Sequence, residues 1–343
     1  MTFAARAIRE SASIATAYIA VAHTTSPYIS VYPWSSGFGN KYANPATLPT
    51  GNADGVAFSP SGADIAVAHS TTPYISVYPW SASGFGTKYA NPSPLPPFDV
   101  NGVTFSPSGS NIALAHNSSP YISVYQWSAS GFGTKYANPS TLPAGTGGGV
   151  AFSPSGADIA VAHFTTPYIS AYPWSSGFGT KYANPATLPA GNANGVAFSP
   201  SGADIAVTHS TSPYISVYPW SGSGFGTKYA DPSTLPVNVG RGVAFSPSGA
   251  DIAVGYQNSS PYISVYQWSA SGFGTKYADP STLPANGGRG VAFSPSGADI
   301  AVAHNVSPYI SAYPWSGSGF GTKYANPSTL PAGSGYGVAW KSI

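Results

Sequence analysis

Six histidines recur at one position of a repeated pattern and are the first candidates for chemistry. They are His23, His69, His116, His163, His209 and His304. An imidazole can ligate a metal ion or take up a proton near neutral pH. Metal ligands must lie about 2 Å from the ion, so residues spread this evenly along the chain cannot share one metal. We expect buried imidazoles bonded to a neighbouring tyrosine or backbone carbonyl, with a pH-responsive ring as the alternative.

Carboxylates recur singly as well, each after a Ser-Pro-Ser-Gly turn. They are Asp64, Asp158, Asp204, Asp251 and Asp299, with Asn111 as the variant. We expect them to close the turn by hydrogen bonds to backbone amides. One carboxylate per repeat supplies no acid–base pair. Seven repeated lysines are expected to pair with these aspartates or to discourage edge pairing: Lys41, Lys88, Lys135, Lys181, Lys228, Lys276 and Lys323.

Other catalytic signatures are missing from the sequence. No Gly-x-Ser-x-Gly elbow stands out from the serine-rich background, and "GFG" lacks the lysine and helix of a phosphate loop. There is no cysteine, so disulfide and thiolate chemistry are excluded. The sequence therefore predicts no catalytic residue, no bound metal, no cofactor and no enzymatic activity.

The charge is low for a protein of 343 residues. Charged residues make up 6% and the net charge is +2, which does not favour a nucleic-acid partner. No apolar run approaches the ~20 residues that span a bilayer, so no membrane span is expected. Serine, threonine, asparagine and exposed backbone must supply the polar surface.

The elements that position these residues follow from a repeat. The first tyrosine of "PYIS" falls at Tyr28, Tyr74, Tyr121, Tyr168, Tyr214, Tyr262 and Tyr309, in steps of 46, 47, 47, 46, 48 and 47. A period in the forties, rich in strand formers and turns, predicts a β-propeller of four-stranded blades. Helical repeats are excluded because 34 prolines and 40 glycines would interrupt them.

Each unit divides into four expected strands. In the second unit they are 55–59, 64–69, 74–80 and 86–96, the last being a proline-rich outer edge. Alternation of Ile65 and Val67 with Ala66 and Ala68 has the period of a strand, and the alanines would let a neighbouring blade approach closely.

The termini predict how the ring closes. The chain begins with the second strand type and ends with the seventh copy of the first type, "GVAW". We predict one all-β domain over residues 1–343, a seven-bladed β-propeller of antiparallel blades. Its first blade combines residues 14–49 with 337–343, so that no sheet edge stays open between the termini. Residues 1–13 would form an N-terminal arm.

The string "GVAFSPSGADIAVAHSTTPYISVYPW" resembles the WD-repeat family, whose inner strand reads "VAFSPDG". This resemblance implies a propeller fold and leaves the function open. The chain departs from the family pattern where Ser61, Ser108 and Ser155 replace its aspartate, and where Tyr-Pro or Tyr-Gln replaces its Trp-Asp pair. The run "GFGTKYANPATLPAGNANGVAFSPSGADIAVAH" is similar to tandem repeats of tailed-bacteriophage proteins, which implies a virion component.

Variation among the seven copies is concentrated in two loops, one before "GV" and one before "PYIS". Because strand direction alternates, both loops lie on one face of the ring. The variation is either drift in exposed loops or a binding face for a partner without seven-fold symmetry. Phe98, Phe164, Arg241, Arg289 and Tyr336 are residue types enriched at interfaces.

The sixth blade is the most divergent. It alone replaces the repeated histidine with a tyrosine and lengthens the following loop, and the only arginines beyond residue 9 flank it. We predict a patch for an anionic or glycan group formed by Arg241, Tyr256, Gln257, Asn258 and Arg289.

The sequence thus predicts a non-enzymatic binding or structural propeller. The first hypothesis is a virion component of a phage tail, fibre or capsid surface, which attaches through the variable loop face to other virion proteins or to a host-surface glycan or protein. A lectin-like glycan binder and a cellular protein-interaction scaffold are the alternatives. A virion or extracellular location is expected, and higher-order assembly is left open.

Overall fold

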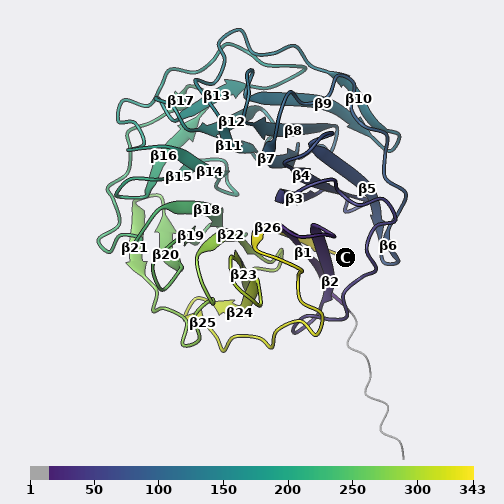
Figure 1. Cartoon of the computed structure of the whole chain (residues 1–343). Helices are drawn as coiled ribbons and strands as arrows, with labels where there is room; N and C mark the ends of the chain where they lie inside the picture. The colour runs from purple at the N-terminus through teal and green to yellow at the C-terminus, as the bar shows by residue number, and fades with distance from the viewer. Residues whose placement is uncertain (1–14) are drawn as a thin grey trace, which may run out of the picture.

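The computed structural model describes residues 15–343, which form an all-β ring of seven blades around a central channel (Figure 1). The predicted fold class is confirmed. The expected arm at residues 1–13 lies outside the described residues. Within the described part of the chain, no helix is long and apolar enough to cross a membrane.

The strands run from the channel outward in each blade. Blade 1 contains β26 (Gly335–Ser342), β1 (Ala17–His23) and β2 (Ile29–Trp34); blade 2 contains β3 (Ala53–Phe58), β4 (Asp64–His69), β5 (Ile75–Ser81) and β6 (Gly84–Phe85). Blade 3 contains β7 (Val100–Phe105), β8 (Asn111–His116), β9 (Ile122–Ser128) and β10 (Gly131–Lys135); blade 4 contains β11 (Gly147–Phe152), β12 (Asp158–His163) and β13 (Ile169–Pro173).

The remaining three blades follow the same order. Blade 5 contains β14 (Ala193–Phe198), β15 (Asp204–His209), β16 (Ile215–Ser221) and β17 (Gly224–Phe225); blade 6 contains β18 (Gly240–Phe245), β19 (Asp251–Tyr256), β20 (Ile263–Ser269) and β21 (Gly272–Lys276). Blade 7 contains β22 (Gly288–Phe293), β23 (Asp299–His304), β24 (Ile310–Ser316) and β25 (Gly319–Phe320).

The ring closes through the two ends of the described chain. The C-terminal strand β26 pairs antiparallel with β1, with Val338 opposite Val21. The inner strands also neighbour one another in a closed circle, because β26 packs against both β3 and β22. The predicted closure of the first blade by the last strand is therefore present.

The outer strand is shorter than the sequence suggests. In blade 2 no residue of the predicted strand 86–96 is in a strand, and the outer strand is the two-residue β6 just before it; blades 1 and 4 keep only an isolated bridge at the position of β6. Prolines have no N–H to donate to a ladder. The segment is attached by single backbone bonds instead, from Gly86 N to Pro79 O and from Tyr89 N to Val77 O.

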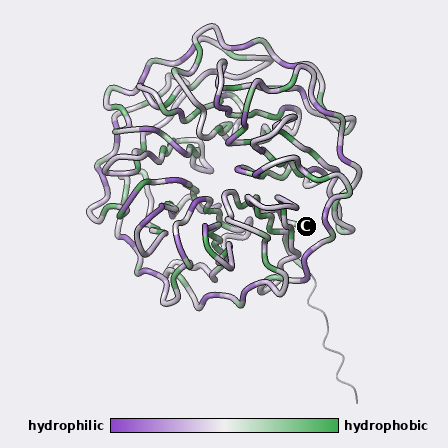
Figure 2. The backbone as a smooth tube through the Cα atoms, in the orientation of Figure 1, coloured by the Kyte–Doolittle hydropathy of each residue, from purple (hydrophilic) through white to green (hydrophobic). Residues whose placement is uncertain are grey.

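Blade-to-blade packing follows the predicted alternation. The small side chains of Ala66 and Ala68 on β4 lie against Ile112 and Leu114 of the next blade, and all four are fully buried. Figure 2 shows the hydrophobic segments within the blades, while hydrophilic segments recur around the rim. The core is thus divided into seven layers between blades.

A buried hydrogen-bond network joins the blades and corrects the role expected for the repeated aspartates. The Asp64 carboxylate accepts hydrogen bonds from Trp127 Nε1 of the next blade at 3.1 Å and from Tyr89 OH of its own blade at 2.9 Å. The turn is closed by Ser59 Oγ, which accepts from Asp64 N. The same arrangement recurs at Asp158, Asp204, Asp251 and Asp299.

Two blade interfaces lack this aspartate. The equivalent residue is Tyr18 in blade 1 and Asn111 in blade 3. The indole Nε1 atoms of Trp80 and Trp174, which pack at these two interfaces, are buried without a hydrogen-bond partner. A buried donor without an acceptor costs about 1–3 kcal/mol.

The inner strands meet at a ring of glycines around the channel. A Cβ atom at Gly242 would lie 2.4 Å from the backbone oxygen of Arg289 in the next blade. The equivalent glycines of the other blades lie against their neighbours' backbones in the same way. A side chain at this position would therefore push two blades apart.

We predict that Gly242→Ala lowers the free energy of unfolding by about 1–3 kcal/mol, because overpacking forces the backbone to shift. Gly222→Ala is the matched control, since a Cβ there meets no atom within 4 Å. Urea denaturation of both variants measures the effect. Equal stabilities would show that the blades can separate at no cost.

We also predict that Asn111→Asp raises the free energy of unfolding by about 1 kcal/mol, because the carboxylate gives the Trp174 indole an acceptor. The mirror variant Asp64→Asn should lower the stability by a similar or larger amount, since it deprives Trp127. Denaturation near pH 7.5 tests both. If neither variant changes the stability, the interblade indole bond does not contribute.

Candidate functional site at the channel mouth

A β-bulge in each inner strand directs one side chain into the mouth of the central channel. In blade 2, Ala53 pairs with His69 and Gly55 with Ala68, so Asp54 is the extra residue between them. The register shifts at the corresponding point in every blade. A bulge re-aims a side chain that would otherwise lie on a strand face. The residue before each Gly-Val pair is therefore presented to the channel.

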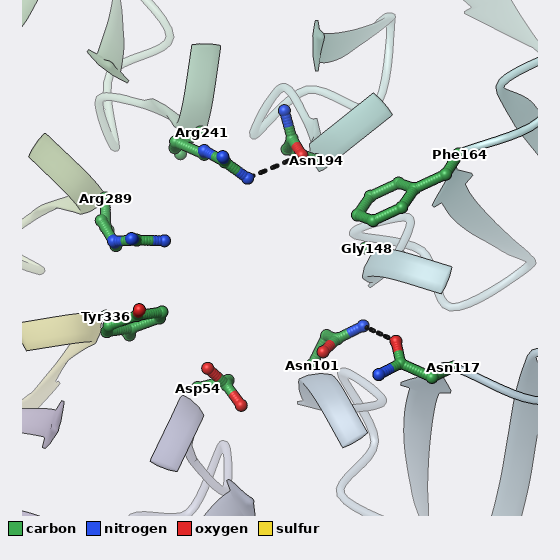
Figure 3. Close-up of a pocket in the computed structure, with 11 residues that line it drawn as sticks. Asp54, Asn101, Asn117, Gly148, Phe164, Asn194, Arg241, Arg289 and Tyr336 are labelled. Carbon is green, nitrogen blue, oxygen red and sulfur yellow. Dashed lines mark hydrogen bonds between the residues drawn. The ribbon is translucent and has the colours of Figure 1, made fainter. Parts of the chain in front are cut away.

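Seven different blades thus supply seven residues to one opening, six with a side chain and one glycine. In order around the ring they are Asp54, Asn101, Gly148, Asn194, Arg241, Arg289 and Tyr336. Together with Asn117 and Phe164 they line a cavity of about 360 Å³ (Figure 3). The scaffold repeats, but this opening is asymmetric in charge and size.

A second tier of residues supports the first. In each of blades 2 to 7 it follows the repeated histidine or tyrosine and comes 16 residues after the bulged residue. Asn101 Nδ2 donates to Asn117 Oδ1 at 2.6 Å, and Arg289 Nε donates to Asn305 Oδ1 at 2.7 Å. Arg241 Nε donates to Gln257 Oε1 at 2.6 Å. In these three blades the bulged side chain is therefore hydrogen-bonded to the side chain that follows it by 16 residues.

In blade 4 the bulged residue and the residue 16 positions later are matched in size rather than by a hydrogen bond. Its bulged residue is Gly148, and a Cβ there would lie 3.0 Å from the Phe164 ring. The half-buried Phe164 ring therefore occupies space that the inner residue of another blade would fill. Blades 2 and 5 have Ser70 and Ser210 at the position of Phe164.

The two arginines form the positive side of the opening. Arg241 Nη1 donates to Asn194 Oδ1 at 3.1 Å, while the Arg289 guanidinium lies 3.8 Å from the centre of the Tyr336 ring. Burial lowers the pKa of both guanidiniums, and the charge of Arg289 lowers the pKa of Arg241 further. Arginine keeps its proton in proteins, so two adjacent positive charges face the cavity.

Asp54 is the carboxylate of the opening. Burial raises the pKa of this carboxyl group to about 7, the charge of Asp99 adds to the rise, and the charge of Arg289 opposes it. Among residues 15–343, Asp54 forms no direct ion pair with either arginine. A carboxyl group that titrates near neutral pH in a cavity can act as a general base.

The structure brings together four of the eight residues that the sequence singled out. Phe164, Arg241, Arg289 and Tyr336 all line the cavity. Gln257 is buried behind them and holds Arg241.

The other three lie elsewhere. Tyr256 is fully buried and its hydroxyl lies 3.2 Å from Ser264 Oγ, so it takes the structural place of the repeated histidine. Asn258 is exposed in its loop with a positive φ of 64°. Phe98 is 46% exposed and stacks on Tyr74, outside the cavity lining.

Sequence reasoning missed Asp54, Asn101, Asn117 and Asn194. It sought unusual residue types in a blade, whereas the cavity collects one fixed position from all blades. Aligning the seven copies on Gly-Val would have revealed the column Asp, Asn, Gly, Asn, Arg, Arg, Tyr. That column is the sequence signal of the cavity, because the bulge directs this position of each blade into the channel mouth.

The repeated histidines are structural. His69 Nε2 lies 3.1 Å from Ser76 Oγ, and His116 Nδ1 lies 2.7 Å from the backbone oxygen of Ser118. All six imidazoles are fully buried. In the described part of the chain, no three histidine or acidic residues are grouped so that they could hold a metal ion. Four of the six make the expected bond to a backbone carbonyl, at His23, His116, His209 and His304, whereas Nδ1 of His69 and of His163 is buried without a partner. Serine takes the place of the expected tyrosine.

The repeated lysines do not pair with the strand aspartates. Lys228 and Lys276 form ion pairs with Asp231 and Asp279 three residues later, and the other repeats place an asparagine there. These contacts lie on the outer rim, away from the mouth.

Comparison with known proteins identifies similar folds. No protein-family model and no curated protein matches the sequence. A putative 6-phosphogluconolactonase from Bacteroides fragilis superposes with a TM-score of 0.75 at 14% identity, covering 96% of this chain and 99% of that one. A second, from Bacteroides uniformis, gives 0.72 at 14% identity, covering 95% and 100%. The periplasmic gluconolactonase of Pseudomonas aeruginosa gives 0.70 at 16%, covering 96% and 100%.

These neighbours contradict the predicted function. Their names are those of lactonases, and they support neither a WD-repeat nor a phage assignment. The prediction of a non-enzymatic virion protein is therefore wrong, and with it the lectin-like and scaffold alternatives. The prediction excluded an enzyme because it looked for paired carboxylates. It did not foresee that burial at the channel mouth raises the pKa of a single carboxyl group, Asp54, to about 7.

The buried histidines predict an acid-sensitive fold. Burial lowers the pKa of each of the six imidazoles to about 4, whereas the unfolded chain has the ordinary value near 6.5. Between these values the unfolded state binds more protons, so stability is complete above about pH 6.5 and falls as the pH drops toward 4. Asp54 has the opposite sign but is a single group.

Urea denaturation from pH 7.5 to pH 4.5 at constant ionic strength measures this loss. We expect the denaturation midpoint to fall continuously across the range. A midpoint that stays constant over it would contradict burial of neutral imidazoles in the folded protein.

Proposed function

We propose that the protein is a lactonase that hydrolyses a cyclic ester in the mouth of the central channel. The observation that carries this proposal is the placement of Asp54, a carboxyl group with a pKa of about 7, in one cavity with two fixed guanidiniums. Ester hydrolysis needs a base to activate water and positive donors for the oxyanion. The mouth supplies both.

Each step can be assigned to residues of the opening. The Asp54 carboxylate takes a proton from water as the water oxygen bonds to the carbonyl carbon. The carbonyl oxygen becomes negative and is stabilised by N–H groups of Arg241 or Arg289. The ring C–O bond then breaks, and the leaving alkoxide receives the proton from Asp54. The product is a hydroxy acid, which loses its acidic proton to solvent.

The second tier makes the arginines effective donors. Gln257 and Asn305 accept from the Nε atoms, which fixes the plane of each guanidinium. Donors that are already oriented need not reorganise when charge develops on the carbonyl oxygen. The same two guanidiniums would bind the carboxylate of the hydroxy-acid product.

The comparisons support this chemistry by analogy. Three solved structures that match nearly the whole chain carry the names gluconolactonase or 6-phosphogluconolactonase. One fold can host many functions, so the assignment depends on the site rather than on the likeness.

We predict that the protein hydrolyses glucono-1,5-lactone or its 6-phosphate, and that Asp54→Asn lowers kcat by about 10²–10⁴-fold because the general base is lost. A pH-stat assay that subtracts spontaneous hydrolysis measures the rate. The rate should rise with pH to a plateau, with a midpoint near the pKa of Asp54.

Asp231→Asn is the matched control, because asparagine occupies this exposed position in other repeats, for example Asn44. It should leave the rate unchanged. The proposal fails if neither lactone is hydrolysed faster than in buffer, or if Asp54→Asn keeps full activity.

A further inference from the structure

We infer that the channel mouth binds a single-ring compound that carries an anionic group. The guanidiniums of Arg241 and Arg289 take the anion, and the face of the Phe164 ring takes the flat side of the ligand's ring. The inference rests on the proposed function for the choice of site, but it concerns recognition rather than hydrolysis. It defines the substrate class of the mouth as cyclic and anionic.

The guanidiniums of Arg241 and Arg289 have N–H donors that no described protein atom accepts. A guanidinium has five N–H donors. Protein partners occupy two on Arg241, at Nε and Nη1, and one on Arg289, at Nε. No described carboxylate forms an ion pair with either arginine. Half-buried guanidiniums on adjacent blades, aimed by neutral amide oxygens, are arranged to receive an external anion.

Phe164 provides the surface on which the ring of the ligand would lie. The fold does not require an aromatic residue here, because two other blades have serine at the same position. A Cβ at position 148 would lie 2.7 Å from the backbone oxygen of Ala193 and 3.0 Å from the Phe164 ring, so glycine leaves room for both the next blade and the ring. An aromatic face on the side of the opening opposite the Tyr336 ring offers stacking to an aromatic ring or to the C–H face of a sugar.

The two ends face each other across the cavity. In Figure 3, Arg289 and Tyr336 lie on one side and Phe164 lies on the opposite side, with Asp54 and Asn101 between them. The volume of about 360 Å³ lies at the lower end of the range for small-molecule sites. It suits one ring with its charged substituent. A bare anion would leave Phe164 uncovered, and a neutral ring would leave two positive charges unpaired.

Isothermal titration calorimetry with stable probes tests the inference without hydrolysis. The probes are inorganic phosphate, phenyl phosphate, glucose 6-phosphate and glucose. We expect phenyl phosphate or glucose 6-phosphate to bind about tenfold more tightly than inorganic phosphate, because stacking adds to the charge interaction. The stronger of the two shows whether the ring is aromatic or a sugar. Glucose should bind at least tenfold more weakly than its phosphate.

Phe164→Ser removes the ring platform and introduces the residue that blades 2 and 5 carry at the same position, Ser70 and Ser210. This variant should lose the advantage of the ring phosphates and keep its affinity for inorganic phosphate. Phe98→Ser, which removes an exposed phenylalanine outside the cavity, should change neither. Arg241→Gln with Arg289→Gln should weaken all phosphates at least tenfold.

The inference is overturned if the ring phosphates bind no more tightly than inorganic phosphate, if no probe binds, or if Phe164→Ser leaves the ring advantage intact. It is also overturned if the arginine substitutions do not weaken binding. Asp54→Asn separates the two proposals, because it should abolish hydrolysis and still bind the ring phosphates. Binding without any lactone hydrolysis would refute the lactonase proposal and leave the inference standing.

Discussion

The close approach of seven inner strands around the channel is the constraint on which the rest of the structure depends. At positions such as Gly242 the backbone of one blade contacts the backbone of the next, and any side chain would force them apart. The contact sets the spacing between blades, and that spacing explains why alanine recurs on the facing strands. The interblade bonds from tryptophan to aspartate then hold the outer parts of the blades together.

The same glycine explains how a repetitive chain can carry a unique site. The Gly-Val pair is the same in every blade, and the residue before it lies in a β-bulge. Its side chain therefore does not pack on either face of the strand. This residue differs among the blades, from glycine at position 148 to arginine at position 241. Seven copies of one rigid position therefore provide seven independent choices at one opening, and side chains such as Gln257 and Asn305 support two of them from the second tier.

The error about function has a physical cause. The sequence argument against an enzyme relied on the lack of paired carboxylates or a metal cluster in the repeats. In the folded ring, burial and the neighbouring Asp99 raise the pKa of Asp54, and the positive groups, Arg241 and Arg289, come from blades 187 and 235 residues further along the sequence. The repeated aspartates, which looked more promising because they recur, are occupied by tryptophan and tyrosine and are not available to a ligand.

The sequence alone determined the number of blades, the closure by the last strand and the burial of the histidines, because periodicity and strand alternation are local properties that repetition amplifies. It also pointed to Arg241, Arg289, Tyr336 and Phe164 as exceptions to the repeat. Only the tertiary structure decided that these residues share a cavity with Asp54 and that Phe98, Tyr256 and Asn258 do not. The reason is geometric: a site on the ring axis is assembled from one bulged position per blade, and no single blade contains enough of it to be recognised.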